Sequence, residues 1–215
     1  MISYVFLLIF AAVTTVHLYA SAKLDKSLRD KTKPWILLSL LGFYVLQTDN
    51  FTWLMVLALI FSWLGDVLLM KQGVKWFTFG GIAFMISHGF FIGSYMKEID
   101  FSVISIAAII VLAAVFIIVV SIIFSKLKQY LPKKLFYPMF LYLLINGAMN
   151  CFAIFRLLSD PWTGSIVTCI GAILFFVSDS SLFFVRFNKD GKQKSHFLVM
   201  LTYSIGELLI VLGMI

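Results

Sequence analysis

Long runs of apolar residues constrain this chain more than any other feature. Runs of spanning or near-spanning length cover 1–20, 34–48, 51–70, 77–96, 101–124, 135–158, 162–186 and 196–215. Of the 215 residues, 62% are hydrophobic and 13% are charged, a balance that a water-soluble globule could present only with large apolar patches on its surface. The sequence therefore predicts an all-α membrane protein, in which residues 1–215 form a single domain of about eight transmembrane helices.

The basic residues predict how these helices cross the bilayer. All but two of the 17 lysines and arginines fall in the odd-numbered connections, and the exceptions are Lys97 and Arg156. Cytoplasmic connections carry an excess of lysine and arginine, so we expect the odd connections in the cytoplasm and both termini on the other side. The net charge of +7 then follows from topology, and nucleic acid is not an expected partner. The expected location is the cytoplasmic membrane of a bacterium.

Three acidic residues, Asp66, Asp179 and Glu207, lie inside the apolar runs. A carboxylate in hydrocarbon costs several kcal/mol unless it is paired, hydrated or protonated, so such residues are functional candidates. Asp66 precedes Lys71 by five positions, and Asp179 precedes Arg186 by seven. At about 1.5 Å per residue, both aspartates lie roughly 7–11 Å from the basic belt. When two carboxyl groups lie at the same depth, one can stay neutral while the other is ionised. General acid/base hydrolysis requires such a pair.

The acids also allow other interpretations. Asp66 and Asp179 could join helix pairs through nearby serines such as Ser178. Glu207, near the middle of the bilayer, could be a protonated hydrogen-bond donor to a neighbouring helix or a third member of the same cavity. The same acids could carry protons in a small transporter of lipids or solutes.

Other polar residues in the apolar runs give weaker signals. His88 has no second histidine four positions away, so its spacing does not predict a zinc site or any other metal site. Asn146 and Asn150 lie one helical turn apart, with Tyr142 a turn before them, so the three share a helix face. They could bind a polar lipid group or join helices. The sequence has no serine-hydrolase, zinc-protease or nucleotide-binding motif.

At these residues the sequence resembles the YhhN family, the lysoplasmalogenases. The matching stretches are Phe61-Ser62, Gly65-Asp66, Leu68-Leu69, Phe84, Ser87-His88, Phe91-Ile92, Ala148-Met149, Gly171-Ala172, Leu174-Phe175 and Ser178-Asp179. A Gly-Asp pair followed by Ser-His and later by Ser-Asp is specific as a combination. One departure is visible: Tyr203 is followed four positions later by Glu207, where the family tends to have glutamine.

The resemblance implies hydrolysis of the vinyl-ether bond of a lysoplasmalogen, with Asp66 and Asp179 as the essential pair. The products would be a fatty aldehyde and a glycerophospho head group. The implied partners are a lysophospholipid and the bilayer, and no cofactor is expected besides water as co-substrate. Which aspartate is the acid and which the base stays open. The expected supporting residues are His88, Tyr142, Asn146, Asn150, Ser178, Tyr203 and Glu207, with Lys33 or Lys71 as candidate phosphate contacts.

Overall fold

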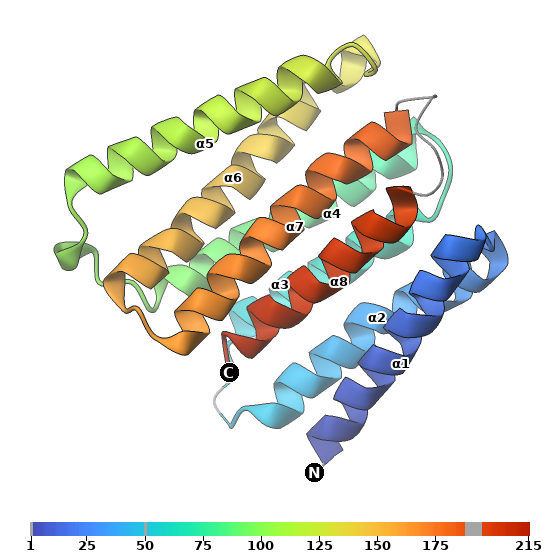
Figure 1. Cartoon of the computed structure of the whole chain (residues 1–215), viewed down its shortest axis with the longest axis horizontal. Helices are drawn as coiled ribbons and strands as arrows, with labels where there is room; N and C mark the ends of the chain where they lie inside the picture. The colour runs from blue at the N-terminus through green and yellow to red at the C-terminus, as the bar shows by residue number, and fades with distance from the viewer. Residues whose placement is uncertain (1, 50, 188–194) are drawn as a thin grey trace.

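The computed structural model describes residues 2–49, 51–187 and 195–215. Over these ranges the chain forms eight α-helices and two short 3-10 helices, with no strand (Figure 1). The α-helices are α1 (Ile2–Lys23), α2 (Lys26–Gln47), α3 (Trp53–Leu69), α4 (Val74–Met96), α5 (Ile106–Leu127), α6 (Phe136–Ser159), α7 (Thr163–Phe187) and α8 (Ser195–Leu212); the 3-10 helices are η1 (Phe101–Val103) and η2 (Lys133–Leu135). The prediction of an all-α fold is confirmed.

Most of the helices are long and apolar enough for a membrane. Five segments qualify by both length and composition: Ile2–Lys23, Val74–Met96, Ile106–Leu127, Lys133–Ser159 and Thr163–Phe187. Two more, Trp53–Leu69 and His196–Leu212, are apolar but shorter. The remaining helix, α2, carries several charged residues in its first turns. The chain therefore has the helices of an integral membrane protein, while the number of eight spans and the orientation of the termini stay predictions.

The second helix begins earlier than we expected. We placed its start at residue 34, after a basic loop, but α2 runs from Lys26 to Gln47 and includes Pro34. The Asp25 carboxylate caps the helix by accepting a hydrogen bond from the Leu28 amide at 3.0 Å. Pro34 removes one backbone hydrogen bond, but it does not end the helix. Most of the basic residues that we assigned to the first connection therefore lie on the first turns of α2.

The fifth helix is also displaced from the expected span of 101–124. Phe101–Val103 form η1, and α5 covers Ile106–Leu127. The Ser105 side chain caps α5 by accepting a hydrogen bond from the Ala108 amide at 3.2 Å. In both corrections a polar capping residue, rather than the edge of the apolar run, decides where the helix begins.

Seven of the helices pack in a closed circuit. In order, α1 packs on α2, α2 on α3, α3 on α4, α4 on α6, α6 on α7, α7 on α8, and α8 returns to α1 and α2. α5 lies at the edge of the bundle against α6 (Figure 1). Only Val120 and Leu127 of α5 are buried, so most of this very apolar helix is exposed, as expected for contact with lipid.

The connections alternate between the two ends of the bundle. The start of α1 and the end of α8 lie at one end, whereas the α1–α2, α3–α4 and α5–α6 connections, the end of α7 and the start of α8 lie at the other (Figure 1). We call the latter the basic end, because the odd connections and the first turns of α2 hold most of the basic residues. Lys189, Lys192 and Lys194, which we also assigned to these connections, lie outside the described residues. The positive-inside rule predicts that the basic end is cytoplasmic.

Arg156 of α6 holds the opposite end together, and its side chain is only 1% exposed. Its guanidinium binds the Glu98 carboxylate through Nε at 2.7 Å and Nη2 at 2.6 Å. Nη1 donates to the Thr168 hydroxyl at 2.7 Å, and Nη2 donates to the Gly213 carbonyl at 2.9 Å. One side chain thus joins α6 to α7 and to the chain segments that follow α4 and α8.

We predict that Arg156→Met destabilises the fold. The change leaves the Thr168 hydroxyl and the Gly213 carbonyl without their partner, at a cost of about 3 kcal/mol for the two together, and it also removes the counter-ion of the half-exposed Glu98 carboxylate. The midpoint of thermal unfolding in detergent should fall by roughly 6–12 °C. Lys97→Met is the matched control, because Lys97 is an exposed cation at the same end with no described ion-pair partner. Equal midpoints for the two variants would contradict the role of Arg156.

Candidate active site

Asp66 lies in the last turn of α3 and is bound through both carboxylate oxygens. Oδ1 is 3.0 Å from the Lys33 ammonium of α2, and Oδ2 accepts a hydrogen bond from the Tyr203 hydroxyl of α8 at 2.9 Å. A Cβ atom at Gly65 would come within 2.5 Å of the Phe84 ring, so glycine at this position lets α4 pack closely beside the carboxylate. Three other helices, α2, α4 and α8, thus approach α3 at Asp66, and its ion partner is a residue that we expected in a loop.

Asp179 of α7 has different neighbours. Its Oδ2 accepts hydrogen bonds from the Tyr142 hydroxyl and from the Asn146 side-chain amide, the latter at 2.8 Å. Asn150 donates to the Asn146 carbonyl at 3.0 Å and so packs behind this contact. The predicted shared face of α6 therefore points at Asp179. Its hydrogen-bond donors are neutral, whereas Asp66 has a cation.

His88 of α4 faces the same carboxyl group. Its Nδ1 contacts the Phe84 carbonyl, which can only accept a hydrogen bond, so Nδ1 carries a hydrogen. Its Nε2 lies 3.6 Å from Asp179 Oδ2 and has no hydrogen-bond partner among the described residues. In a neutral imidazole of this tautomer, Nε2 would turn a lone pair toward the carboxyl group. In this tautomer His88 therefore donates no hydrogen bond to Asp179.

The two aspartates line one cavity of about 80 Å³. Lys33, Arg186, His196 and Tyr203 contribute to the same lining. The rings of Phe84 and Tyr203 line one side of the cavity with their centroids 6.2 Å apart, and the Phe175 ring packs edge to face against both. Ser178 also lines the cavity and donates to the Val199 carbonyl at 2.9 Å, which joins α7 to α8. The cavity therefore combines two carboxyl groups, cations and an apolar wall in one small volume.

Glu207 of α8 is fully buried but does not line the cavity. Neither of its carboxyl oxygens has a hydrogen-bond partner among the described residues, although Ser62 lies beside it. Ser87 donates to the Ala58 carbonyl at 2.8 Å, so Ser62 must be the donor in its 2.7 Å contact with Ser87. The hydroxyl of Ser62 can then offer Glu207 only a lone pair.

Two larger hollows adjoin the cavity. An apolar groove of about 580 Å³ lies mainly between α4 and α6, shares Phe77 with the cavity, and is also lined by Tyr142. A basic hollow of about 250 Å³ lies at the basic end and shares Lys33, Arg186 and His196 with the cavity. Lys71, the other candidate phosphate contact, lies with its ammonium 4.0 Å from the Trp76 ring centroid and lines neither the cavity nor the hollow.

Sequence reasoning missed the part that α2 plays in this site. We treated its basic residues as topology signals and Lys33 as a candidate phosphate contact, but Lys33 contacts Asp66 directly. A signal was present, because Lys26, Arg29 and Lys33 follow helical spacing and Asp25 is a typical N-cap. Among the described residues, no group of three or more His, Cys, Asp or Glu side chains is arranged as metal ligands would be.

The YhhN family matches residues 28–214 of the 215-residue chain. The matched range contains both aspartates and each residue described above that contacts them. No curated protein and no solved structure matches the chain. Because the family match covers most of the sequence, the chain belongs to the YhhN family.

Proposed function

We propose that this protein is a lysoplasmalogenase-type hydrolase, which cleaves the vinyl-ether bond of an alkenyl lysophospholipid with water as co-substrate. The products are a fatty aldehyde and a glycerophospho head group. One observation carries the proposal: two buried carboxyl groups face one cavity, one beside an ammonium and the other beside neutral donors. Such unlike surroundings allow one carboxyl group to stay protonated while the other is ionised. Membership of the YhhN family is consistent with a hydrolase of this kind.

The contacts support Asp179 as the acid. Asp66 has the Lys33 ammonium as a counter-ion, whereas the Tyr142 hydroxyl and the Asn146 amide are neutral. An ionised carboxylate without a cation is costly in a site of low polarity. Asp179 Oδ2 already accepts two hydrogen bonds, while Oδ1 accepts none from the described residues. The transferable proton therefore belongs on Oδ1 of Asp179, and Asp66 is the ionised partner.

These roles give a balanced reaction. Asp179 transfers its proton to the β carbon of the vinyl ether, and the remaining positive charge spreads over the α carbon and the ether oxygen. Asp66 stabilises this oxocarbenium ion and takes a proton from water as the water oxygen bonds to the α carbon. The hemiacetal then collapses: its hydroxyl proton returns to Asp179, and Asp66 protonates the departing glycerol oxygen. Both carboxyl groups end in their starting states.

The apolar groove suits the hydrocarbon chain of such a substrate. A cavity of about 80 Å³ can hold a reacting group and a water molecule, but not a lipid chain. The groove of about 580 Å³ is lined almost entirely by apolar side chains. Tyr142 lines the groove and donates a hydrogen bond to Asp179, so a chain in the groove would end beside the proposed acid.

We predict that Asp179→Asn and Asp66→Asn each lower aldehyde release from an alkenyl lysophospholipid at least a hundredfold, because each removes one partner of the proton transfer. Tyr142→Phe should cause a smaller loss, since it removes one of the two hydrogen bonds to Asp179 Oδ2. Aldehyde is measured by mass spectrometry, and folding is checked by the thermal midpoint. A folded parent that releases no aldehyde, while its acids are needed for proton flux in vesicles, would instead support the proton-coupled transporter.

Proton transfer to carbon leaves a mark on the product. In D₂O the parent should release aldehyde with one deuterium on carbon 2, because the β carbon of the vinyl ether receives the solvent-derived proton of Asp179. Unlabelled aldehyde, incubated for the same time, is the control for exchange after release. Product without deuterium at carbon 2 would rule out carbon protonation and the assigned acid.

Gly81 offers a test of the groove. A Cβ at this position would meet only Tyr142 Cδ2, at 4.0 Å, so a leucine side chain would extend into the groove. We predict that Gly81→Leu raises KM for a long-chain alkenyl substrate roughly tenfold and leaves a short-chain substrate nearly unchanged. Gly89→Leu is the matched control, because Gly89 is on the same helix and a Cβ there meets nothing within 4 Å. Equal effects on both chain lengths would contradict this placement.

A further inference from the structure

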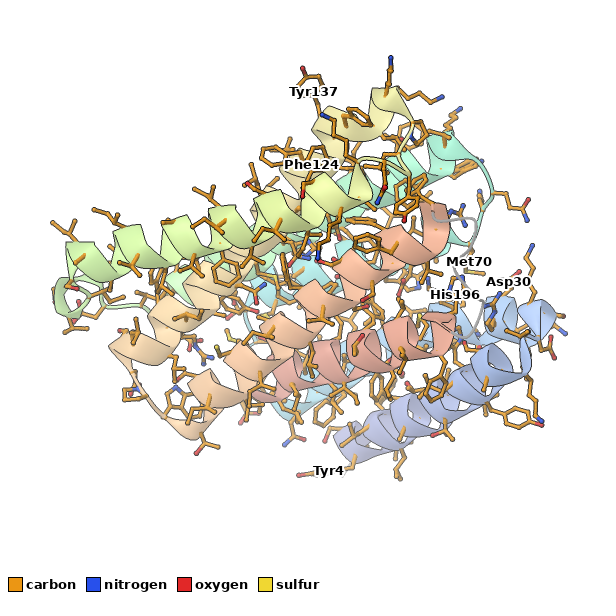
Figure 2. The ribbon with its side chains drawn as sticks, turned by 45° about the horizontal axis from the view of Figure 1, so that its top comes forward. Tyr4, Asp30, Met70, Phe124, Tyr137 and His196 are labelled. Carbon is orange, nitrogen blue, oxygen red and sulfur yellow. The ribbon has the colours of Figure 1, made fainter. Side chains whose placement is uncertain are left out.

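The basic hollow is a concentration of positive charge next to the candidate active site. Lys26, Arg29 and Lys33 of α2 line it at helical spacing, and Arg186 of α7 belongs to the same lining. Asp30 is the one acidic residue in its lining. Figure 2 shows three of its lining residues, Asp30, Met70 and His196, at the same end of the bundle. The hollow therefore offers cations from two helices that are far apart in the sequence.

Most of these cations form no ion pair with a carboxylate of the described residues. The described ion pairs of lysine and arginine are Lys33 with Asp66 and Arg156 with Glu98. No carboxylate in the described ranges lies within 4.0 Å of Lys26 or Arg29. Lys33 differs, because its ammonium is already bound to Asp66. A hollow lined in this way attracts an anion.

The hollow continues into the cavity that holds the aspartates. Lys33, Leu69, Arg186, His196 and Met200 line both spaces. An anionic group in the hollow would therefore lie close to the two carboxyl groups, because the same five residues line both spaces. In a lysophospholipid, three glycerol carbons separate the ether oxygen from the phosphate ester oxygen. A vinyl ether in the cavity would thus bring its phosphate to the adjoining hollow.

We infer that the basic hollow binds a phosphate group, with Arg29 and Arg186 as guanidinium donors and Lys26 as a further cation. Guanidinium groups match phosphate oxygens in bidentate geometry, which makes arginine the suited residue here. The identity of the ligand as the head group of the lipid substrate rests on the proposed function. The assignment differs from our expectation for Lys33, which is committed to Asp66, and for Lys71, which lies over Trp76 outside the hollow.

The activity test compares substrates with and without phosphate. We expect Arg29→Gln and Arg186→Gln each to raise KM for an alkenyl lysophosphatidylethanolamine about tenfold or more, since each removes a charged hydrogen-bond donor. In Arg29→Gln, KM for a 1-alkenylglycerol, which has no phosphate, should stay at the parental value, because Arg29 does not line the cavity with the aspartates. Arg29→Lys keeps the charge and should have a smaller effect. Lys75→Gln is the matched control, because Lys75 is an exposed cation at the same end that does not line the hollow.

A binding test separates this inference from the proposed reaction. The probe is an alkyl-ether lysophospholipid, which lacks the vinyl bond, with its affinity for the detergent-purified full chain measured by native mass spectrometry. Weaker binding to Arg29→Gln and Arg186→Gln, but not to Lys75→Gln, supports the phosphate site even if the parent hydrolyses no alkenyl lipid. Competition by inorganic phosphate would show that the free ion is also accepted, whereas its failure would assign the hollow to lipid-borne phosphate. Parental affinity in both arginine variants would overturn the inference.

Discussion

The ion pair between Lys33 and Asp66 is the contact on which the rest of the site depends. A charge buried among apolar helices is stable only when an opposite charge or hydrogen-bond donors reach it. Lys33 supplies that charge from α2 at 3.0 Å, and Tyr203 supplies a hydrogen bond from α8 at 2.9 Å. Asp66 therefore depends on side chains that α2 and α8 bring to α3. The ion pair also leaves Asp179 as the carboxyl group without a neighbouring ammonium.

The difference between the two aspartates is built from ordinary packing contacts. Phe84, Phe175 and Tyr203 pack edge to face and join α4 to α7 and α8, and both acids line one cavity. The α6 face with Tyr142 and Asn146 reaches Asp179, while α2 and α8 reach Asp66. The same residue type thus acquires two environments, which is the condition for one acid and one base in a single site.

Arginines at the two ends of the bundle have different surroundings. Arg156 is surrounded by partners that use its guanidinium nitrogens, so it ties helices together and has little capacity left for a ligand. Arg29 and Arg186 instead line a hollow that opens toward the aspartates. The satisfied cation stabilises the fold, whereas the cations around the hollow can bind an anion. This contrast separates structural from ligand-binding arginines in a chain with few charges.

The sequence alone determined that this is a helical membrane protein and that Asp66 and Asp179 are its outstanding polar residues. Both conclusions depend only on short stretches of sequence. A long apolar run indicates that the surrounding solvent is lipid, and an acid inside such a run can be recognised without knowing which residues contact it. Tertiary structure decided the partners. Lys33 looked like a topology signal because its contact with Asp66 joins two different helices. The sequence likewise did not show that the α6 face with Tyr142 and Asn146 donates hydrogen bonds to Asp179, because that contact forms only when α7 packs against α6. The unlike surroundings of the two acids arise only when distant segments meet, so no pattern along the chain could predict them.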